Sequence, residues 1–269
     1  CLPIHLSHIF CNTKIDRPAR FPPRRARARA AMALSKLSGD EQCIIFSQLC
    51  NTLEPGTAVA FSSTSNELRA LSQALLQQLR ADHEMAAALC RKMGMRSCKV
   101  LREAKQVVCD LKGLPAADLA TLGSLGSVLP ALEELHLIES AAGAASPYGV
   151  LRLVERLGAG ALASVTKLCI SGALVGEAAA SALAAALGQG ALPLLQTLQL
   201  NSAAIDDAGL VALAPALRRL PALETLDLSY CSLGDEGLAA LVAPLPAGAP
   251  PPPTGVLTTL QTLYLCWTQ

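Results

Sequence analysis

The stretch Leu223-Glu-Thr-Leu226-Asp-Leu228-Ser-Tyr-Cys231-Ser-Leu233 decides the architecture of this chain. It follows the pattern Leu-x-x-Leu-x-Leu-x-x-(Asn, Cys or small)-x-Leu, and leucines two residues apart lie on the same side of a strand. The same pattern returns at 132–142, 165–175, 195–205 and, cut short, at 260–269. A line that recurs at a nearly fixed interval predicts an array of one small structural unit.

The second leucine of the pattern gives the spacing of the units. It is Leu135, Leu168, Leu198, Leu226 and Leu263, so the successive steps are 33, 30, 28 and 37 residues. Twenty-eight residues before Leu135 lies Val107, which predicts a degenerate leading unit. The 37-residue step holds four consecutive prolines within 244–255. Because proline cannot continue a helix, we expect a polyproline loop there on the convex side.

This pattern resembles the leucine-rich repeat, and its spacing is similar to that of the ribonuclease-inhibitor-like class. The resemblance implies an α/β fold, a right-handed solenoid with parallel strands on its concave face and helices on its convex face. The runs 205–210 and 233–238 carry acids where the helices should begin, and acids there complement the helix dipole. The resemblance covers 107–269, and we expect this array to be C-terminally truncated because it stops within a strand.

The first residues differ from the rest in composition and charge. Residues 1–36 carry eight Lys or Arg and one acid, a net charge of +7, whereas 37–269 carry fourteen and twenty, a net charge of −6. We interpret 1–31 as a disordered basic segment that is not native to the protein, with Met32 as the true start. The alternative is an organelle transit peptide or a nuclear signal.

Residues 32–106 are predicted to be helical. Ser38 precedes Asp40 and Glu41, a pattern that favours a helix start, and Pro55-Gly56 ends this helix. A second helix is expected from about Ala58 and a third over roughly 81–95. These helices predict an all-helical cap that shields the apolar face of the first repeat.

The same region resembles an F-box in a degenerate form. The resemblance rests on Leu37, Asp40-Glu41, Ile45-Phe46, Leu49, Pro55 and the run 59–71. Ser38 stands where that motif has Pro, and Leu68 stands where it has Trp. If the region is F-box-like, the resemblance implies that it binds the adaptor of a cullin–RING ubiquitin ligase. The adaptor-binding residues would then be Leu37, Ile45, Phe46, Leu49 and Pro55.

Composition excludes several classes of protein. The chain is 52% hydrophobic and 3% aromatic, which suits a core of stacked Leu- and Ala-rich units. Its ten cysteines lie in a chain too long for a small disulfide scaffold, so we expect reduced thiols in a cytoplasmic or nuclear protein. The uncharged stretch 178–205 is broken by Gly and Pro and follows the repeat, so no membrane span is predicted.

Strand positions of the repeat that face away from the leucines predict a concave binding surface. Its expected partner-binding residues are Glu134, His136, Lys167, Gln199, Asn201, Asp227, Tyr230, Tyr264 and Trp267. The last two units place three aromatic residues there, and aromatic side chains are enriched at binding hot spots. The alternative for Trp267 is that it packs against sequence beyond this chain.

Few residues in the sequence indicate a catalytic or metal-binding site. His136 lies near Glu134 and Glu139, but no nucleophile with a recognisable signature accompanies it, so we expect a solvated strand residue.

Cys231 should turn inward and bond the backbone of the next strand. The spacing of Cys1, His5, His8 and Cys11 resembles a zinc site but falls in the doubtful basic segment. We therefore predict no enzymatic activity, no cofactor and no metal.

The sequence thus predicts a monomeric protein-interaction module with a protein partner and no nucleic-acid partner. A specific version makes the chain the substrate-recognition subunit of a cullin–RING ubiquitin ligase. A regulatory protein of the Ran GTPase-activator type and a purely structural scaffold remain the alternatives.

Overall fold

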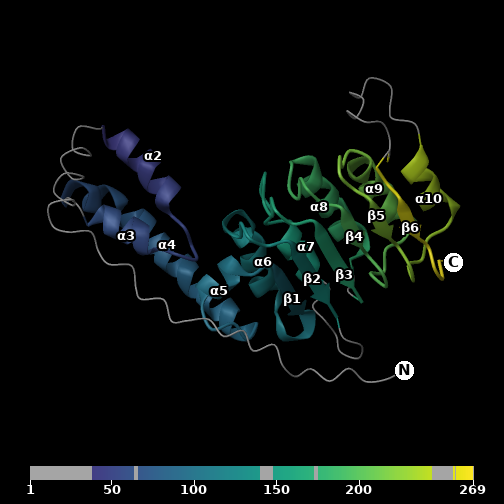
Figure 1. The fold of residues 1–269 in the computed structure, drawn as a ribbon, viewed down its shortest axis with the longest axis horizontal. Helices are drawn as coiled ribbons and strands as arrows, with labels where there is room; N and C mark the ends of the chain where they lie inside the picture. The colour runs from purple at the N-terminus through teal and green to yellow at the C-terminus, as the bar shows by residue number, and fades with distance from the viewer. Residues whose placement is uncertain are drawn as a thin grey trace.

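The computed structural model describes residues 38–63, 66–139, 148–172, 175–243, 257 and 259–268 of this chain. A group of helices lies at one end, and strands alternating with helices run from it toward the C-terminus (Figure 1). The predicted segments 1–31 and 244–256 lie outside the described residues, as does Leu37. Within the described part, every helix is too short or too polar to cross a membrane.

Among the described residues, four helices precede the sheet. They are α2 (Gly39–Leu49), α3 (Gly56–Ser62), α4 (Asn66–Lys92) and α5 (Cys98–Glu103). The strands are β1 (Gln106–Asp110), β2 (Glu134–Ile138), β3 (Lys167–Ser171), β4 (Thr197–Gln199), β5 (Thr225–Asp227) and β6 (Thr262–Tyr264). Between them lie η1 (Leu111–Gly113), α6 (Ala116–Ser124), η2 (Leu125–Val128), α7 (Gly149–Val154), α8 (Gly176–Gly188), α9 (Asp207–Leu217) and α10 (Asp235–Val242).

The six strands form one parallel sheet in chain order. Leu135 pairs with Leu168, and the same register continues through Leu198 and Leu226 to Leu263, which confirms the predicted alignment of the units. Val107 pairs with Leu135, so the predicted leading unit is confirmed as β1. An α/β fold with strands and helices in alternation is therefore established.

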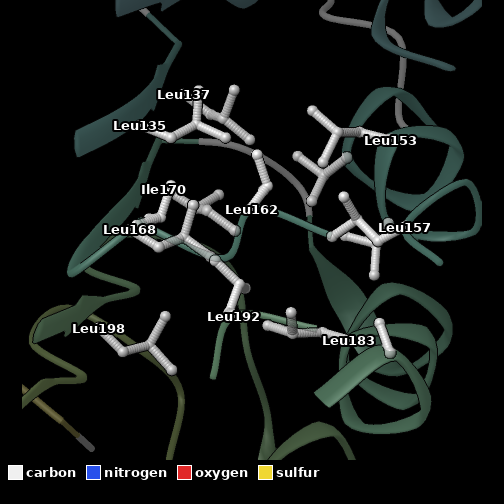
Figure 2. Packing of buried hydrophobic residues seen from close by; sticks show 14 of the residues in the cluster. Leu135, Leu137, Leu153, Leu157, Leu162, Leu168, Ile170, Leu183, Leu192 and Leu198 are labelled. Atoms are coloured by element: carbon white, nitrogen blue, oxygen red, sulfur yellow. The ribbon is translucent and has the colours of Figure 1, made fainter. Parts of the chain in front are cut away.

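The core lies between the sheet and the helices. Leu135 and Leu137 of β2, with Leu168 and Ile170 of β3, point toward the helical side, where Figure 2 shows Leu153, Leu157 and Leu183. Leu162 and Leu192 lie between the two layers. Because each strand buries its leucines against the neighbouring units as well as its own, the core is continuous along the array.

Small residues let the helices of successive units pack closely. A Cβ atom added to Gly123 of α6 would lie 2.2 Å from the carbonyl oxygen of Leu153 in α7, so only glycine fits there. In α8, the methyl groups of Ala179 and Ala180 are buried. The neighbouring helices α8 and α9 are in contact along this Ala-rich layer.

Asp207 joins two consecutive helices. It lies in the first turn of α9, and its Oδ1 accepts hydrogen bonds from the backbone N–H groups of Gly234 (2.8 Å) and Gly237 (3.0 Å) at the start of α10. Asp206 is the N-cap of α9 itself and accepts from the N–H of Gly209. The acids predicted to lie at these helix starts are thus confirmed in place, and Asp207 caps the helix of the next unit as well.

The helical region confirms one predicted start and corrects two boundaries. Ser38 and Glu41 form a reciprocal capping box at the start of α2. The sequence predicts separate helices from about Ala58 and over 81–95, but α4 runs unbroken from Asn66 to Lys92. No Gly or Pro interrupts 66–92, whereas α3 ends where the Ser62 and Ser63 hydroxyls bond back to the carbonyls of Val59 and Ala60.

This region contacts two groups of buried side chains. Phe46, Ala58, Leu76 and Leu79 form a small cluster among α2, α3 and α4. Further along, Leu89 and Cys90 of α4 belong to the same core as Val107 in β1. The Lys92 ammonium pairs with the Asp118 carboxylate of α6, and Arg102 pairs with Glu54, so ion pairs also connect the helical region within itself and to the first unit.

We expect an Asp207→Ala substitution to destabilise the protein by about 1–2 kcal/mol, because two backbone N–H groups of α10 lose their acceptor. Asp207→Asn, which keeps a side-chain oxygen, should recover part of that loss. Asp235→Ala is the matched control, since Asp235 is exposed at the start of the same helix. Urea unfolding followed by circular dichroism gives the free energies. Equal losses for Asp207→Ala and Asp235→Ala would contradict the cross-unit cap.

Candidate binding face

The side chains on the strands alternate between the core and the opposite side of the sheet. In β2, Leu135 and Leu137 are buried while Glu134, His136 and Ile138 lie on the other side. We call this other side the open face. It comprises Gln106, Val108, Asp110, Glu134, His136, Ile138, Lys167, Cys169, Ser171, Thr197, Gln199, Asn201, Thr225, Asp227, Ser229, Thr262, Tyr264 and Cys266. The predicted partner-binding residues on the strands therefore share one surface.

Strand register places these residues in rows across the sheet. The central row runs Val108, His136, Cys169, Gln199, Asp227 and Tyr264. A second row begins with Gln106, Glu134 and Lys167 and ends in three threonines. Charged residues thus gather on β1 to β3, while the β5–β6 end combines one carboxylate with an aromatic ring.

His136 belongs to a polar network at the N-terminal end of the open face. Its Nε2 lies 3.0 Å from Oε2 of Glu134 and 3.2 Å from Nε2 of Gln106. Cys169 is its neighbour on β3 by register, but this thiol is buried. Burial raises the pKa of Cys169, and Asp227 raises it further while Lys167 opposes it. A raised pKa disfavours the thiolate, so this arrangement does not activate a nucleophile.

Polar side chains also brace the strand ends. Asn201 donates from Nδ2 to the Ser171 hydroxyl at 3.0 Å, which joins two neighbouring units. The Oδ1 of Asp227 accepts from the backbone N–H of Ser229 at 3.0 Å. Asn201 is thus held by a neighbouring side chain, and Asp227 is oriented by its own strand end.

The residue that follows each strand end has a recurring backbone conformation. Gly172, Ser202, Tyr230 and Trp267 occupy the same position in four units, and each has a positive φ between 54° and 72°. The N–H of Tyr230 donates to the carbonyl of Cys266 (2.8 Å), and that of Ser202 donates to the carbonyl of Ser229 in the same way. This hydrogen-bond ladder holds non-glycine residues in a conformation that L-residues disfavour.

Tyr230 and Trp267 are exposed because of this position. The Tyr230 side chain is 59% exposed although a further unit with its own strand follows it. Trp267, at the equivalent position, is 80% exposed, and Tyr264 on β6 is 47% exposed. The three aromatic residues of the predicted set thus lie on the last two units of the array, and Tyr264 is the register neighbour of Asp227. We call Asp227, Tyr230, Tyr264 and Trp267 the aromatic corner.

The leading unit adds residues that the predicted set omitted. Gln106, Val108 and Asp110 of β1 extend the open face by one strand. The signal was present in the sequence, because aligning Val107 with Leu135 assigns these three residues to outward positions. Val108 is exposed and apolar, and Gln106 contacts the His136 network.

The residues that the F-box resemblance selects lie in different environments. Phe46 is only 1% exposed and packs in the small helical cluster, while Leu49 is partly buried against it. Ile45 is half-buried and Pro55 lies at the start of α3. Ile44, which the resemblance did not select, is 62% exposed on α2.

Cys231 has the inward structural role predicted for it. Its Sγ donates to the carbonyl oxygen of Leu200 at 3.2 Å. The predicted direction is wrong, because Leu200 belongs to the preceding unit and not to the next. The thiol points toward the residue that follows β4, because the turn after β5 orients the Cys231 side chain toward the preceding unit.

A groove of about 910 Å³ lies away from the open face, lined by residues of α4, α6 and α7. Its floor on α6 consists of small side chains such as Ala116, Ala117 and Ala120. Arg152 and Glu155 on its wall pair with each other at 2.9 Å. Within the described residues, no group of three His, Cys, Asp or Glu side chains is arranged to hold a metal ion.

Comparison with known proteins supports the repeat. A family model described as Leucine Rich repeat matches residues 191–214 and 220–242, which include β4, most of α9, β5 and α10. These two matches support a leucine-rich repeat protein, and such repeats mediate protein binding. No curated protein matches the chain.

The cysteines should differ sharply in reactivity. Burial raises the pKa of Cys90 and of Cys109 to about 12, so at pH 8 almost none of either thiol is ionised. Cys266 is exposed. We expect iodoacetamide at pH 8 to label Cys266 in the native protein while Cys90 and Cys109 stay unmodified, as measured by peptide mass spectrometry. In urea all three should react, and equal labelling in the native protein would contradict the packing.

Proposed function

We propose that this chain is a non-enzymatic binding protein whose open face holds a protein partner. One observation carries the proposal: the open face is a continuous surface across six strands. It carries polar, apolar and aromatic side chains, while the core leucines lie on the other side of the sheet. A rigid scaffold with variable outward residues suits recognition, because the binding side chains are held in place before the partner arrives. The leucine-rich repeat matches support protein binding as the general role.

The candidate contact residues fall at the two ends of this face. Glu134, His136 and Lys167 lie toward β1, and the aromatic corner lies at β5 and β6. Gln199 and Asn201 connect the two ends through β4 and the residues after it. A partner that spans these positions would contact most of the sheet. We propose that the protein acts in the cytoplasm or nucleus, and the free thiols among the described residues suit such a reducing compartment.

The proposal predicts that partner binding depends on the open face and not on the helical layer. The partners of the full chain are first isolated from cells and identified by quantitative mass spectrometry. A Gln199→Ala, Tyr264→Ala double variant should then bind the purified partner at least about tenfold more weakly, as is typical when hot-spot residues are truncated. A Leu194→Ala, Val211→Ala double variant is the control, since both side chains are exposed outside the open face.

The result has a clear contrary outcome. If the open-face variant binds the partner with unchanged affinity while the control variant loses it, the helical layer is the binding surface and the proposal fails. Circular dichroism and the urea midpoint establish that each variant remains folded.

We further propose, as a second candidate role, that the helical region docks the adaptor of a cullin–RING ubiquitin ligase. The observation that favours it is the exposure of an apolar side chain on each of α2 and α3, namely Ile44 and Val59. Phe46 would fix these two helices against each other, because it shares a buried cluster with Ala58 of α3. In this version α2 to α5 also cap the first unit, and the open face selects the substrate.

This role predicts that the full chain binds the purified adaptor directly. Ile44→Asp should weaken that binding at least about tenfold, because it places a charge in an apolar contact. Leu75→Asp, an equally drastic change at an exposed residue of α4, is the control. Isothermal titration calorimetry measures both, and no heat of binding with the unmodified chain would end the ligase proposal while leaving the open face untouched.

A further inference from the structure

The aromatic corner has a charge environment of its own. Asp227 lies on β5 between Gln199 of β4 and Tyr264 of β6, neither of which is a Lys, Arg, Asp or Glu. Its Oδ1 is held by the Ser229 N–H, and its carboxylate forms no ion pair within the described residues. The cation on the strands of the open face, Lys167, is two strands away on β3 and neighbours Glu134. A fixed, uncompensated carboxylate therefore faces the partner.

Three exposed aromatic side chains accompany this carboxylate. Tyr264 is its neighbour across the β5–β6 pair, and Tyr230 follows three residues after Asp227 on the same edge. The N–H of Tyr230 bonds to the carbonyl of Cys266, the residue next to Trp267, so the two loops that carry Tyr230 and Trp267 lie side by side. Aromatic faces attract cations through their quadrupole, and a carboxylate does so through its charge.

The strands of the open face together carry a net negative charge. Its strands carry Asp110, Glu134 and Asp227 against Lys167 alone. Charge complementarity steers a partner and fixes its orientation. A basic polypeptide segment fits such a surface, and an acidic one would meet repulsion at both ends of the sheet.

We propose that the aromatic corner binds a cationic side chain, arginine or lysine, from a basic segment of a separate protein partner. The guanidinium or ammonium group bonds the Asp227 carboxylate and lies against the faces of Tyr230, Tyr264 and Trp267. Arginine is the better fit, because its planar group stacks on aromatic rings while it donates to a carboxylate. This inference rests on the proposed binding function and specifies the chemistry of the partner.

The corner contains its own reporter, because Trp267 is the single tryptophan of the chain. The probe is an eight-residue Gly/Ser peptide with two arginines and blocked ends, titrated into the full chain while tryptophan emission is recorded. The matched peptide replaces arginine by citrulline, which has nearly the same shape without the charge. We expect a saturable change of emission with the arginine peptide and at least about tenfold weaker binding of the citrulline peptide, as for loss of a charged hydrogen bond.

Variants localise the effect to the corner. Asp227→Asn should lower the affinity for the arginine peptide at least about fivefold, because charged hydrogen bonds are lost. Tyr264→Ala should lower that affinity about threefold, because a cation–π contact is lost. Glu177→Gln removes one negative charge from the first turn of α8, in the helical layer, and should leave the affinity unchanged. Circular dichroism checks that each variant is folded.

Several results would overturn the inference. Equal binding of the arginine and citrulline peptides, or no saturable change up to about 10 mM peptide, would exclude a cation site. Tighter binding of a matching glutamate peptide would assign the opposite charge to the partner while leaving the open face as the binding surface. Self-association of the chain that Asp227→Asn abolishes, seen by sedimentation, would name the arginine-rich residues 17–29 of a second copy as the source and exclude a separate partner.

Discussion

The stacking of inward-facing strand residues in register is the constraint on which this structure depends. Val107, Leu135, Leu168, Leu198 and Leu226 occupy the same position in five successive units, and all are buried. A unit of this size cannot bury its apolar face alone, so each one is stabilised by its neighbours. Parallel direction and chain order follow, because a single strand–helix unit repeats with its leucines always on the same side.

That constraint divides the side chains into two sets with different freedom. Inward positions must remain Leu, Ile, Val or small residues, because the layer between sheet and helices is closely packed. Outward positions lie outside the packed layer between sheet and helices, and so they can vary from Lys167 to Tyr264 without disturbing the core. The position after these strands is restricted in backbone but not in side chain, since the hydrogen-bond ladder holds residues as different as Gly172 and Tyr230 in the left-handed region.

The sequence predicted the parts of the fold that a repeated pattern controls. The strand register and the leading unit at Val107 came from spacing alone, because a repeat fixes which residues are equivalent. The helical region has no such repeat, and the boundary between α3 and α4 was misplaced because the serines that end α3 act through side-chain bonds to the backbone. The direction of the Cys231 bond was equally local, since it depends on how one turn is oriented.

The polar groups at the two ends of the open face differ in how many hydrogen bonds they already form, and this difference bears on where the proposed partner would gain binding energy. Glu134, His136 and Gln106 bond to one another, so a partner must break those contacts before forming its own. Asp227 is held by one backbone N–H and keeps an oxygen available beside Tyr264. A polar group that is already ordered but has an unused hydrogen-bonding position loses little conformational entropy on association, and it gains a full hydrogen bond. In the proposed complex, the C-terminal end of the sheet would therefore offer the larger net gain, and the N-terminal network would contribute orientation through its charge.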